Sequence, residues 1–234
     1  MKKKLVVFSG AGISAESGIK TFRDSDGMWE EFNVMEVATL SGWKINREKV
    51  LSFYNKRKND LNTVQPNNAH KIIAELEQYY DVTVITQNVD DLHERAGTTN
   101  VIHLHGELNK MCSSKNKNLT LPYTEDIKIG DKHEDGSQLR PFIVWFGEPV
   151  PLFPLAKDIV ETADYFVVIG TSLQVYPAAS LLECVNDECK LYYIDKEPTI
   201  DALMFKADIL QRMCYLPGLA TEGVDMLKRK LLNN

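Results

Sequence analysis

The sequence predicts an α/β fold in which helices flank a parallel β-sheet and a smaller lobe is inserted into the chain. Three observations support this prediction: short continuous apolar runs, helical periodicity in the segments between them, and a polar or glycine-containing turn directly after each run. With 234 residues, of which 44% are hydrophobic and 26% charged, the chain is long and apolar enough for one medium domain with a small additional lobe.

Four apolar runs are the predicted strands, and they cover residues 5–8, 82–85, 165–169 and 191–194. A run that is apolar throughout, instead of alternating, is typical of a strand buried on both faces, as in a parallel sheet. The polar turns after these runs should therefore gather at one edge of the sheet, where open α/β folds bind their ligands.

Helices are predicted between the strands, at residues 67–79, 177–185 and 224–232. Two other segments interrupt the alternation. Residues 30–62 are helical and charged, and they form a predicted inserted lobe. Residues 107–140 are rich in charge and poor in large apolar groups, which predicts a surface module with little structure of its own.

Composition and charge exclude several classes of protein. The net charge of −6 disfavours binding to nucleic acid, which depends on clustered Lys and Arg. No apolar run approaches the roughly 18 residues of a membrane span, and the first apolar stretch is too short for a signal peptide. Four cysteines do not resemble a disulfide scaffold. We expect a cytoplasmic protein with reduced thiols and neither a nucleic-acid nor a membrane partner.

A glycine loop follows the first predicted strand. Gly10, Gly12 and Ala15 satisfy the pattern G-x-G-x-x-A, which permits a tight turn and close approach of the backbone to a pyrophosphate. The alternative is an ordinary turn from a strand to a helix. A hydride-transferring enzyme would need a second strand soon afterwards, ending in an acid that binds the ribose. The next clear strand ends only at Ile85 and is followed by amides, so the pattern fits a site that binds NAD in order to break it.

Polar residues also follow the second strand. Gln87, Asn88 and Asp90 are spaced to hydrogen-bond a carboxamide and ribose hydroxyls, or else they form a solvated turn. Two histidines come shortly afterwards, and one of them could act as a base near neutral pH. His103 and His105 lie on the same face of a short predicted strand, so their spacing does not choose between them.

The motifs taken together resemble the sirtuin family of NAD-dependent protein-lysine deacylases, over residues 5–231. Six motifs occur in the family's order, at residues 10–14 (GAGIS), 18–23 (GIKTFR), 86–90 (TQNVD), 105–106 (HG), 144–148 (VWFGE) and 170–173 (GTSL). The resemblance implies a Rossmann-like NAD-binding domain and a smaller lobe, with NAD and an acylated lysine meeting in the cleft between them. The implied domain comprises residues 1–29, 63–106 and 141–234, and the lobe comprises the helical insert 30–62 and the region 107–140.

The resemblance also implies roles for individual residues. It makes His105 the general base, with His103 as its packed neighbour, and places Asn88 and Asp90 beside it in catalysis. The reaction would release nicotinamide and an acyl-ADP-ribose. NAD would contact Gly10, Ala11, Gly12, Ala15, Thr21, Phe22, Arg23, Gln87, Asn88, Asp90, His105, Gly170, Thr171, Ser172, Asp195 and Lys196. The backbone of an acylated peptide would pair with a strand that contains Val144, Phe146 and Gly147.

This chain departs from the family at two places. Asp195 stands where an Asn is usual, and its carboxylate can still accept hydrogen bonds from both ribose hydroxyls. Sirtuins usually carry two cysteine pairs that bind structural zinc, but the corresponding interval here contains Cys112 alone. A mixed site that combines Cys112 with His133, Glu134 or Asp135 is conceivable. Because structural zinc prefers four Cys or His ligands, we expect none.

The resemblance extends to the acyl group. Tyr54 and Arg57 match the Tyr-x-x-Arg of class III sirtuins, which prefer succinyl- and malonyl-lysine, and Ala38 matches a small residue that makes room in their pocket. A guanidinium and a phenol can bind the terminal carboxylate of such an acyl chain. The alternative is that both residues lie on a solvated, charged helix.

Two other functions remain open for the same cleft. An NAD glycohydrolase or ADP-ribosyltransferase would need no peptide-docking strand, so the segment 144–148 favours the deacylase. A non-catalytic NAD sensor would have no use for a base such as His105. We therefore expect an acylated-lysine protein or peptide as the partner, and the sequence makes no prediction of the oligomeric state.

Overall fold

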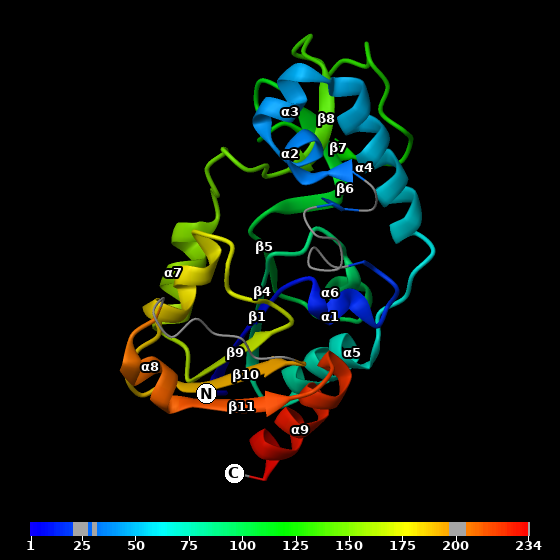
Figure 1. Ribbon diagram of the computed structural model, residues 1–234. Coiled ribbons are helices and arrows are strands. Elements are labelled where there is room, and N and C mark those ends of the chain that lie inside the picture. The colour runs from blue at the N-terminus through cyan, green and yellow to red at the C-terminus, as the bar shows by residue number, and fades with distance from the viewer. Residues whose placement is uncertain (21–27, 30–31, 197–204, 234) are drawn as a thin grey trace.

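The computed structural model describes residues 1–20, 28–29, 32–196 and 205–233, and its largest element is a six-stranded parallel sheet (Figure 1). The strand order is β11-β10-β9-β1-β4-β5. The strands are β1 (Lys4–Ser9), β4 (Asp81–Thr86), β5 (Val101–His103), β9 (Tyr165–Ile169), β10 (Lys190–Asp195) and β11 (Met213–Pro217). Every neighbouring pair is parallel, so the predicted α/β class and all four predicted strands are confirmed.

Helices cover both faces of this sheet. One face packs against α5 (Asn68–Glu75) and α9 (Ala220–Leu232), and the other packs against α7 (Phe153–Glu161), η2 (Ala178–Cys184) and α8 (Ala207–Arg212). Along β1, Leu5 and Val7 join the first core, whereas Val6 and Phe8 join the second. A strand buried on both faces must be apolar at every position, which explains the runs in the sequence.

The predicted helices lie where they were expected, but two of them are partly or wholly 3₁₀ helix instead of α-helix. The helix expected at residues 67–79 is α5 followed by a 3₁₀ turn, η1 (Leu76–Gln78). The segment expected to be helical at residues 177–185 is a 3₁₀ helix, η2. Among the described residues, no helix is both long enough and apolar enough to span a membrane.

The strand order changes direction at β1, although all six strands are parallel. The chain continues from β1 to β4 and β5 on one side, and returns to β9, β10 and β11 on the other. The connections therefore diverge at the carboxyl ends of β1 and β9 and leave a crevice there. α1 (Gly12–Ala15) begins at this position, within the glycine motif.

A small lobe, which we define as α2 to α4 together with β6 to β8, stands at the carboxyl edge of the sheet (Figure 1). Its helices are α2 (Val34–Val37), α3 (Leu40–Ile45) and α4 (Arg47–Leu61). Its antiparallel sheet has the order β7-β6-β8 and consists of β6 (Gly106–Ser113), β7 (Thr120–Pro122) and β8 (Leu139–Ile143). A short two-stranded ribbon, β2 (Met28–Trp29) with β3 (Phe32–Asn33), precedes α2.

The expectation that residues 107–140 would have little structure of their own is wrong. β6 pairs with β7 and β8, and its residue Leu108 joins a core shared with Tyr54 of α4 and with Tyr123 and Ile127 of the following loop. Polar residues stand within β6, and β7 is exposed along its whole length, so apolar residues are few in this segment. The small number of apolar residues in this segment therefore does not exclude an ordered sheet.

Candidate active site

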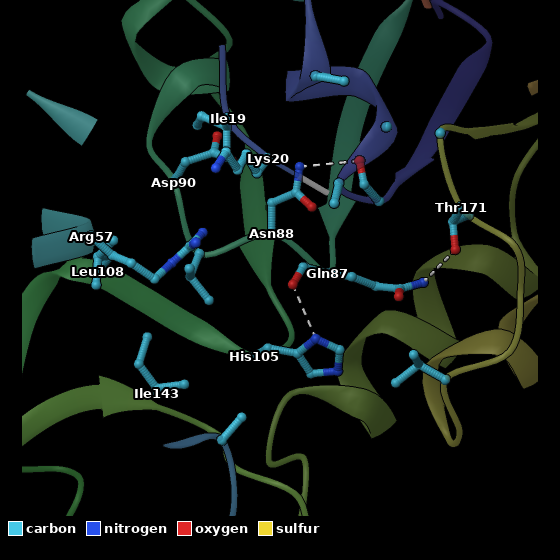
Figure 2. A pocket seen from close by; sticks show the side chains of 18 of the residues that line it. Ile19, Lys20, Arg57, Gln87, Asn88, Asp90, His105, Leu108, Ile143 and Thr171 are labelled. Atoms are coloured by element: carbon cyan, nitrogen blue, oxygen red, sulfur yellow. Dashed lines mark hydrogen bonds between the residues drawn. The ribbon is translucent and has the colours of Figure 1, made fainter. Parts of the chain in front are cut away.

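A cavity of about 970 Å³ lies between the carboxyl ends of the parallel strands and the small lobe. Loops after β1, β4, β9 and β10 line it from the sheet, and α4 and the segment after β8 line it from the lobe. Figure 2 shows side chains from both parts pointing into the same space. A cavity at the switch point of a parallel sheet is the ordinary place for a nucleotide-sized ligand.

The glycine loop packs directly against the turn after β9. The N–H of Gly12 donates to the carbonyl of Gly170 at 2.8 Å, and the N–H of Gly10 donates to that of Ile169 at 3.0 Å. A Cβ added to Gly12 would lie 2.7 Å from the Cα of Gly170, which itself has a φ of +62°. These glycines are therefore required by the contact between the two turns as well as by any ligand. Gly10, Ala11, Gly12 and Ala15 all line the cavity.

The polar residues after β4 are fixed by hydrogen bonds to the first loop. Asn88 is buried, and its Nδ2 donates to the carbonyl of Gly10 at 3.2 Å and to the Oγ of Ser14 at 3.3 Å. Asp90 accepts from the Oγ of Ser14 at 3.1 Å, and burial raises the pKa of this carboxyl. The Nε2 of Gln87 donates to Thr171 at 3.3 Å, as Figure 2 shows. The solvated-turn alternative therefore does not describe these side chains.

The two histidines have different environments. His105 lines the cavity, and its Nδ1 donates to the carbonyl of Gln87 at 3.0 Å (Figure 2). A carbonyl only accepts, so the proton is on Nδ1 and Nε2 is left with its lone pair. Burial lowers the pKa of His105, which keeps the ring neutral at pH 7.

His103 lies behind this position and does not line the cavity. Its Nδ1 is 3.0 Å from the carbonyl of Asn88, and its Nε2 is 2.7 Å from the carboxylate of Glu94. Burial alone would lower the pKa of His103, but the hydrogen bond and charge of Glu94 outweigh it and raise the pKa above 6.5. Both ring nitrogens of His103 are therefore engaged. The structure thus distinguishes the two histidines, which their spacing in the sequence does not.

The sequence analysis missed a buried polar network under the polar residues after β4. Ser14 joins Asn88 to Asp90, and its Oγ lies 3.5 Å from the Nε2 of His70. Burial lowers the pKa of His70 to about 4, so this ring is neutral. Asn67 caps α5 and accepts from the Nδ1 of His70 at 3.1 Å. The spacing of a capping Asn and a His three residues later was the available signal.

The other expected nucleotide contacts lie at the ends of β9 and β10. Gly170, Thr171 and Ser172 line the cavity, as do Asp195 and Lys196. The hydroxyl of Tyr193 donates to the carbonyl of Thr171 at 2.9 Å, which holds this turn in place. Gly218, Leu219 and Ala220, at the start of α9, line the same end and were not anticipated. Thr21, Phe22 and Arg23 lie outside the described residues.

The expected acyl-binding residues lie at the end of the cavity formed by the small lobe. Tyr54 and Arg57 of α4 are 1% and 8% exposed and line the cavity, as does Ala38. Figure 2 shows Arg57 projecting into it. The alternative of a solvated helix face is therefore wrong for both residues. Burial raises the pKa of Tyr54 to about 12, so its hydroxyl keeps its proton.

The segment 144–148 is not the regular strand that the sequence predicts. β8 ends at Ile143, and Phe146 forms one isolated bridge with Thr39. The N–H of Phe146 donates to Ala38 at 2.9 Å, and its carbonyl accepts from Leu40 at 3.2 Å, so these groups are used within the chain. The segment tethers α2 and α3 to β8, and Val144, Phe146 and Gly147 all line the cavity.

The residues present in the small lobe do not fit a structural zinc ion. No three His, Cys, Asp or Glu side chains group as metal ligands within the described part of the chain. Burial raises the pKa of Cys112 to about 11, which favours the thiol over the thiolate that zinc requires. Instead, the Oγ of buried Ser113 donates to Asp135, lies 2.8 Å from the hydroxyl of Ser137, and accepts from the N–H groups of the following turn.

The parallel sheet, the glycine loop at its switch point and the polar residues around the cavity define a dinucleotide-binding α/β protein. The Sir2 family model matches residues 10–177. The NAD-dependent protein deacylase of Helicobacter pylori (strain ATCC 700392 / 26695) is 58% identical over 193 residues, which are 82% of this chain and 84% of that protein. That of Bacteroides thetaiotaomicron is 49% identical over 237 residues, 98% of each chain. The chain belongs to the Sir2 family, as its motifs indicated.

Solved structures agree with this assignment. A Sir2 homologue in complex with NAD has a TM-score of 0.84 at 39% identity, covering 99% of this chain and 90% of that one. A Sir2 mutant with a p53 peptide and NAD has a TM-score of 0.77 at 26% identity, covering 100% of this chain and 95% of that one.

Proposed function

We propose that this Sir2-family chain is an NAD-dependent protein-lysine deacylase that removes succinyl and malonyl groups in preference to acetyl groups. The observation that carries the proposal is the shared cavity: a histidine with an available Nε2 and a buried Tyr–Arg pair open into the same space. The names of the relatives support the deacylase. The buried cation of Arg57 supports an acidic acyl group.

NAD would occupy the sheet side of the cavity, which we call the nucleotide end. The glycine loop, with Ala11 and Ala15, would receive the pyrophosphate, and the turn at residues 170–172 would receive the adenosine half together with Asp195 and Lys196. Gln87, Asn88 and Asp90 would hold the nicotinamide ribose and the carboxamide. Bound NAD supplies an electrophilic anomeric carbon and a leaving group that is already cationic.

His105 would act on a ribose hydroxyl. Its Nδ1–H is held by the carbonyl of Gln87, so its Nε2 is presented to the cavity with the lone pair that a base needs. Asn88 and Asp90, fixed through Ser14, would orient the ribose. The products are then the free lysine, nicotinamide and an O-acyl-ADP-ribose.

The side of the cavity formed by the small lobe, which we call the acyl end, would bind the acyl chain. A succinyl or malonyl chain ends in a carboxylate, and the planar fork of a guanidinium matches the geometry of a carboxylate. Charge-assisted hydrogen bonds from Arg57 and Tyr54 would contribute about 1.5–3 kcal/mol each, enough for roughly ten- to hundredfold discrimination against an acetyl group. Val144, Phe146 and Gly147 would contact the peptide, and Ala38 would leave room for the longer chain.

We also propose that the small lobe holds its shape without zinc. The hydrogen bonds around Ser113 join β6 to the loop before β8, where metal coordination would otherwise do so. Metal analysis of the purified protein tests this proposal. Zinc in a stoichiometric amount would contradict it.

The proposed reaction is tested by incubating the protein with NAD and one peptide carrying succinyl-, malonyl- or acetyl-lysine, and by identifying the products with mass spectrometry. Acyl-ADP-ribose formed fastest from the succinyl and malonyl peptides supports the proposal. Nicotinamide release that does not depend on the peptide would instead indicate a glycohydrolase. An acetyl rate equal to the succinyl rate would contradict the acyl preference.

A further inference from the structure

The hydroxyl of Tyr54 has a fixed hydrogen-bond polarity. The indole Nε1–H of Trp145 donates to it at 3.0 Å, within a core where both rings are almost fully buried. An indole N–H can only donate, so the phenolic oxygen accepts in this bond and its own proton is not used there. Because the pKa of Tyr54 is raised to about 12 by burial, the proton stays on the oxygen. Tyr54 is thus set to donate.

Trp145 is itself held at its ring and at its backbone N–H. The guanidinium of Arg140 stacks on the indole, with Cζ 3.4 Å from the ring centroid. The same guanidinium bonds both oxygens of Glu148, at 2.8 and 3.1 Å, and the carboxylate accepts from the backbone N–H of Trp145 at 2.9 Å. Lys117 lies 2.8 Å from this carboxylate. The indole is therefore clamped by Arg140 of β8, which is held in turn by Glu148 of the segment after β8.

We propose that Trp145, clamped by Arg140 and Glu148, is a positioning residue that fixes Tyr54 as a hydrogen-bond donor to the carboxylate of the acyl group. This inference rests on the proposed preference for acidic acyl groups. It attributes part of that preference to residues that need not touch the acyl chain. A phenol that accepts one hydrogen bond is a stronger donor in the next, and one with a fixed orientation loses less entropy on binding.

The inference predicts a selective effect on binding. In a Trp145→Phe variant the ring remains and the N–H is lost, so the ratio of succinyl to acetyl kcat/KM should fall roughly three- to tenfold, the scale of one hydrogen bond. The change should appear in KM for the succinyl peptide more than in kcat. A merely structural tryptophan would change both substrates alike.

A matched control is available in the same core. Trp43 is buried, and its ring centroid lies 5.3 Å from that of Trp145. A Trp43→Phe variant makes the same chemical change beside Trp145 without removing the bond to the Tyr54 hydroxyl, so the ratio should stay at the wild-type value.

A double-mutant cycle gives the decisive result. In a Tyr54→Phe background, Trp145→Phe should leave the succinyl-to-acetyl ratio unchanged, because the hydroxyl that it positions is gone. Ratios that multiply independently in the double variant would overturn the inference. If Trp145→Phe does not fold, Arg140→Lys loosens the clamp and should lower the ratio in the same direction; an equal loss on both substrates would overturn the inference.

The two proposals fail in different ways. A wild-type protein without a succinyl preference overturns both of them. A wild-type preference that Arg57→Met abolishes and that neither Trp145→Phe nor Arg140→Lys alters overturns the positioning role alone.

Discussion

The nucleotide end of the cavity is built from loops that follow the strands of the large sheet, whereas the acyl end is built from a helix that a second segment of the small lobe supports. At the nucleotide end, the residues stand directly after strands, and hydrogen bonds between the loops hold them, as between Asn88 and Gly10. At the acyl end, Tyr54 is held by Trp145, 91 residues away, and Arg140 and Glu148 hold Trp145. Motifs therefore name residues at both ends, whereas the support of Tyr54 by Trp145 and Arg140 becomes visible only in the folded chain.

The largest effect is expected at the nucleotide end. His105→Ala should reduce turnover by roughly two to three orders of magnitude, the scale of a lost general base, while NAD still binds. Steady-state kinetics and NAD titration by calorimetry measure the two quantities. His103→Ala is the control, and it should act through stability because His103 is bonded to Glu94 and does not line the cavity. An inactive His103 variant beside an active His105 variant would contradict the assignment.

The sequence predicts the large sheet better than the small lobe. The strands of the large sheet were evident because burial on both faces leaves continuous apolar runs, as at residues 165–169. The sheet of the small lobe was missed because β6 carries Glu107, Asn109 and Lys110 among its apolar positions, and none of its three strands is a continuous apolar run. The sequence predicts Gly170 as a ligand contact. Its close packing against Gly12 is a tertiary contact, which no local sequence pattern can predict.

The small lobe should depend on Ser113 for stability. Ser113→Ala removes a buried hydroxyl that bonds Asp135 and Ser137. The hydrogen bonds that Asp135 accepts from Ser113 and Ser137 lower the pKa of its carboxyl to about 2. The free energy of unfolding should fall by about 1–3 kcal/mol, the cost of leaving buried polar groups unsatisfied. Urea unfolding measures this loss. The adjacent, half-buried Ser114→Ala is the control, and an equal effect of both changes would contradict the role of Ser113.

The pH dependence should show a smaller effect. Because burial lowers the pKa of His105 below its ordinary value of 6.5, the ring stays unprotonated as the pH falls to that value. The acid limb of kcat/KM for deacylation should therefore lie below pH 6.5, with activity lost as the pH falls through the lowered pKa. A limb centred above that pH would indicate that another group, or a charged His105, controls the rate.

The central claim is that the acyl end selects a carboxylate independently of the nucleotide end, and Arg57→Met tests it most directly. The measurement is kcat/KM on one peptide sequence carrying succinyl- or acetyl-lysine, for the wild type, Arg57→Met and a control, Arg47→Met. Arg47 lies on the same helix, is exposed over Trp43 and does not line the cavity. Arg57→Met should lower kcat/KM roughly ten- to hundredfold on the succinyl peptide and change the acetyl value by less than about twofold, while Arg47→Met should change neither. An equal loss on both peptides would show that Arg57 is structural and would contradict the claim.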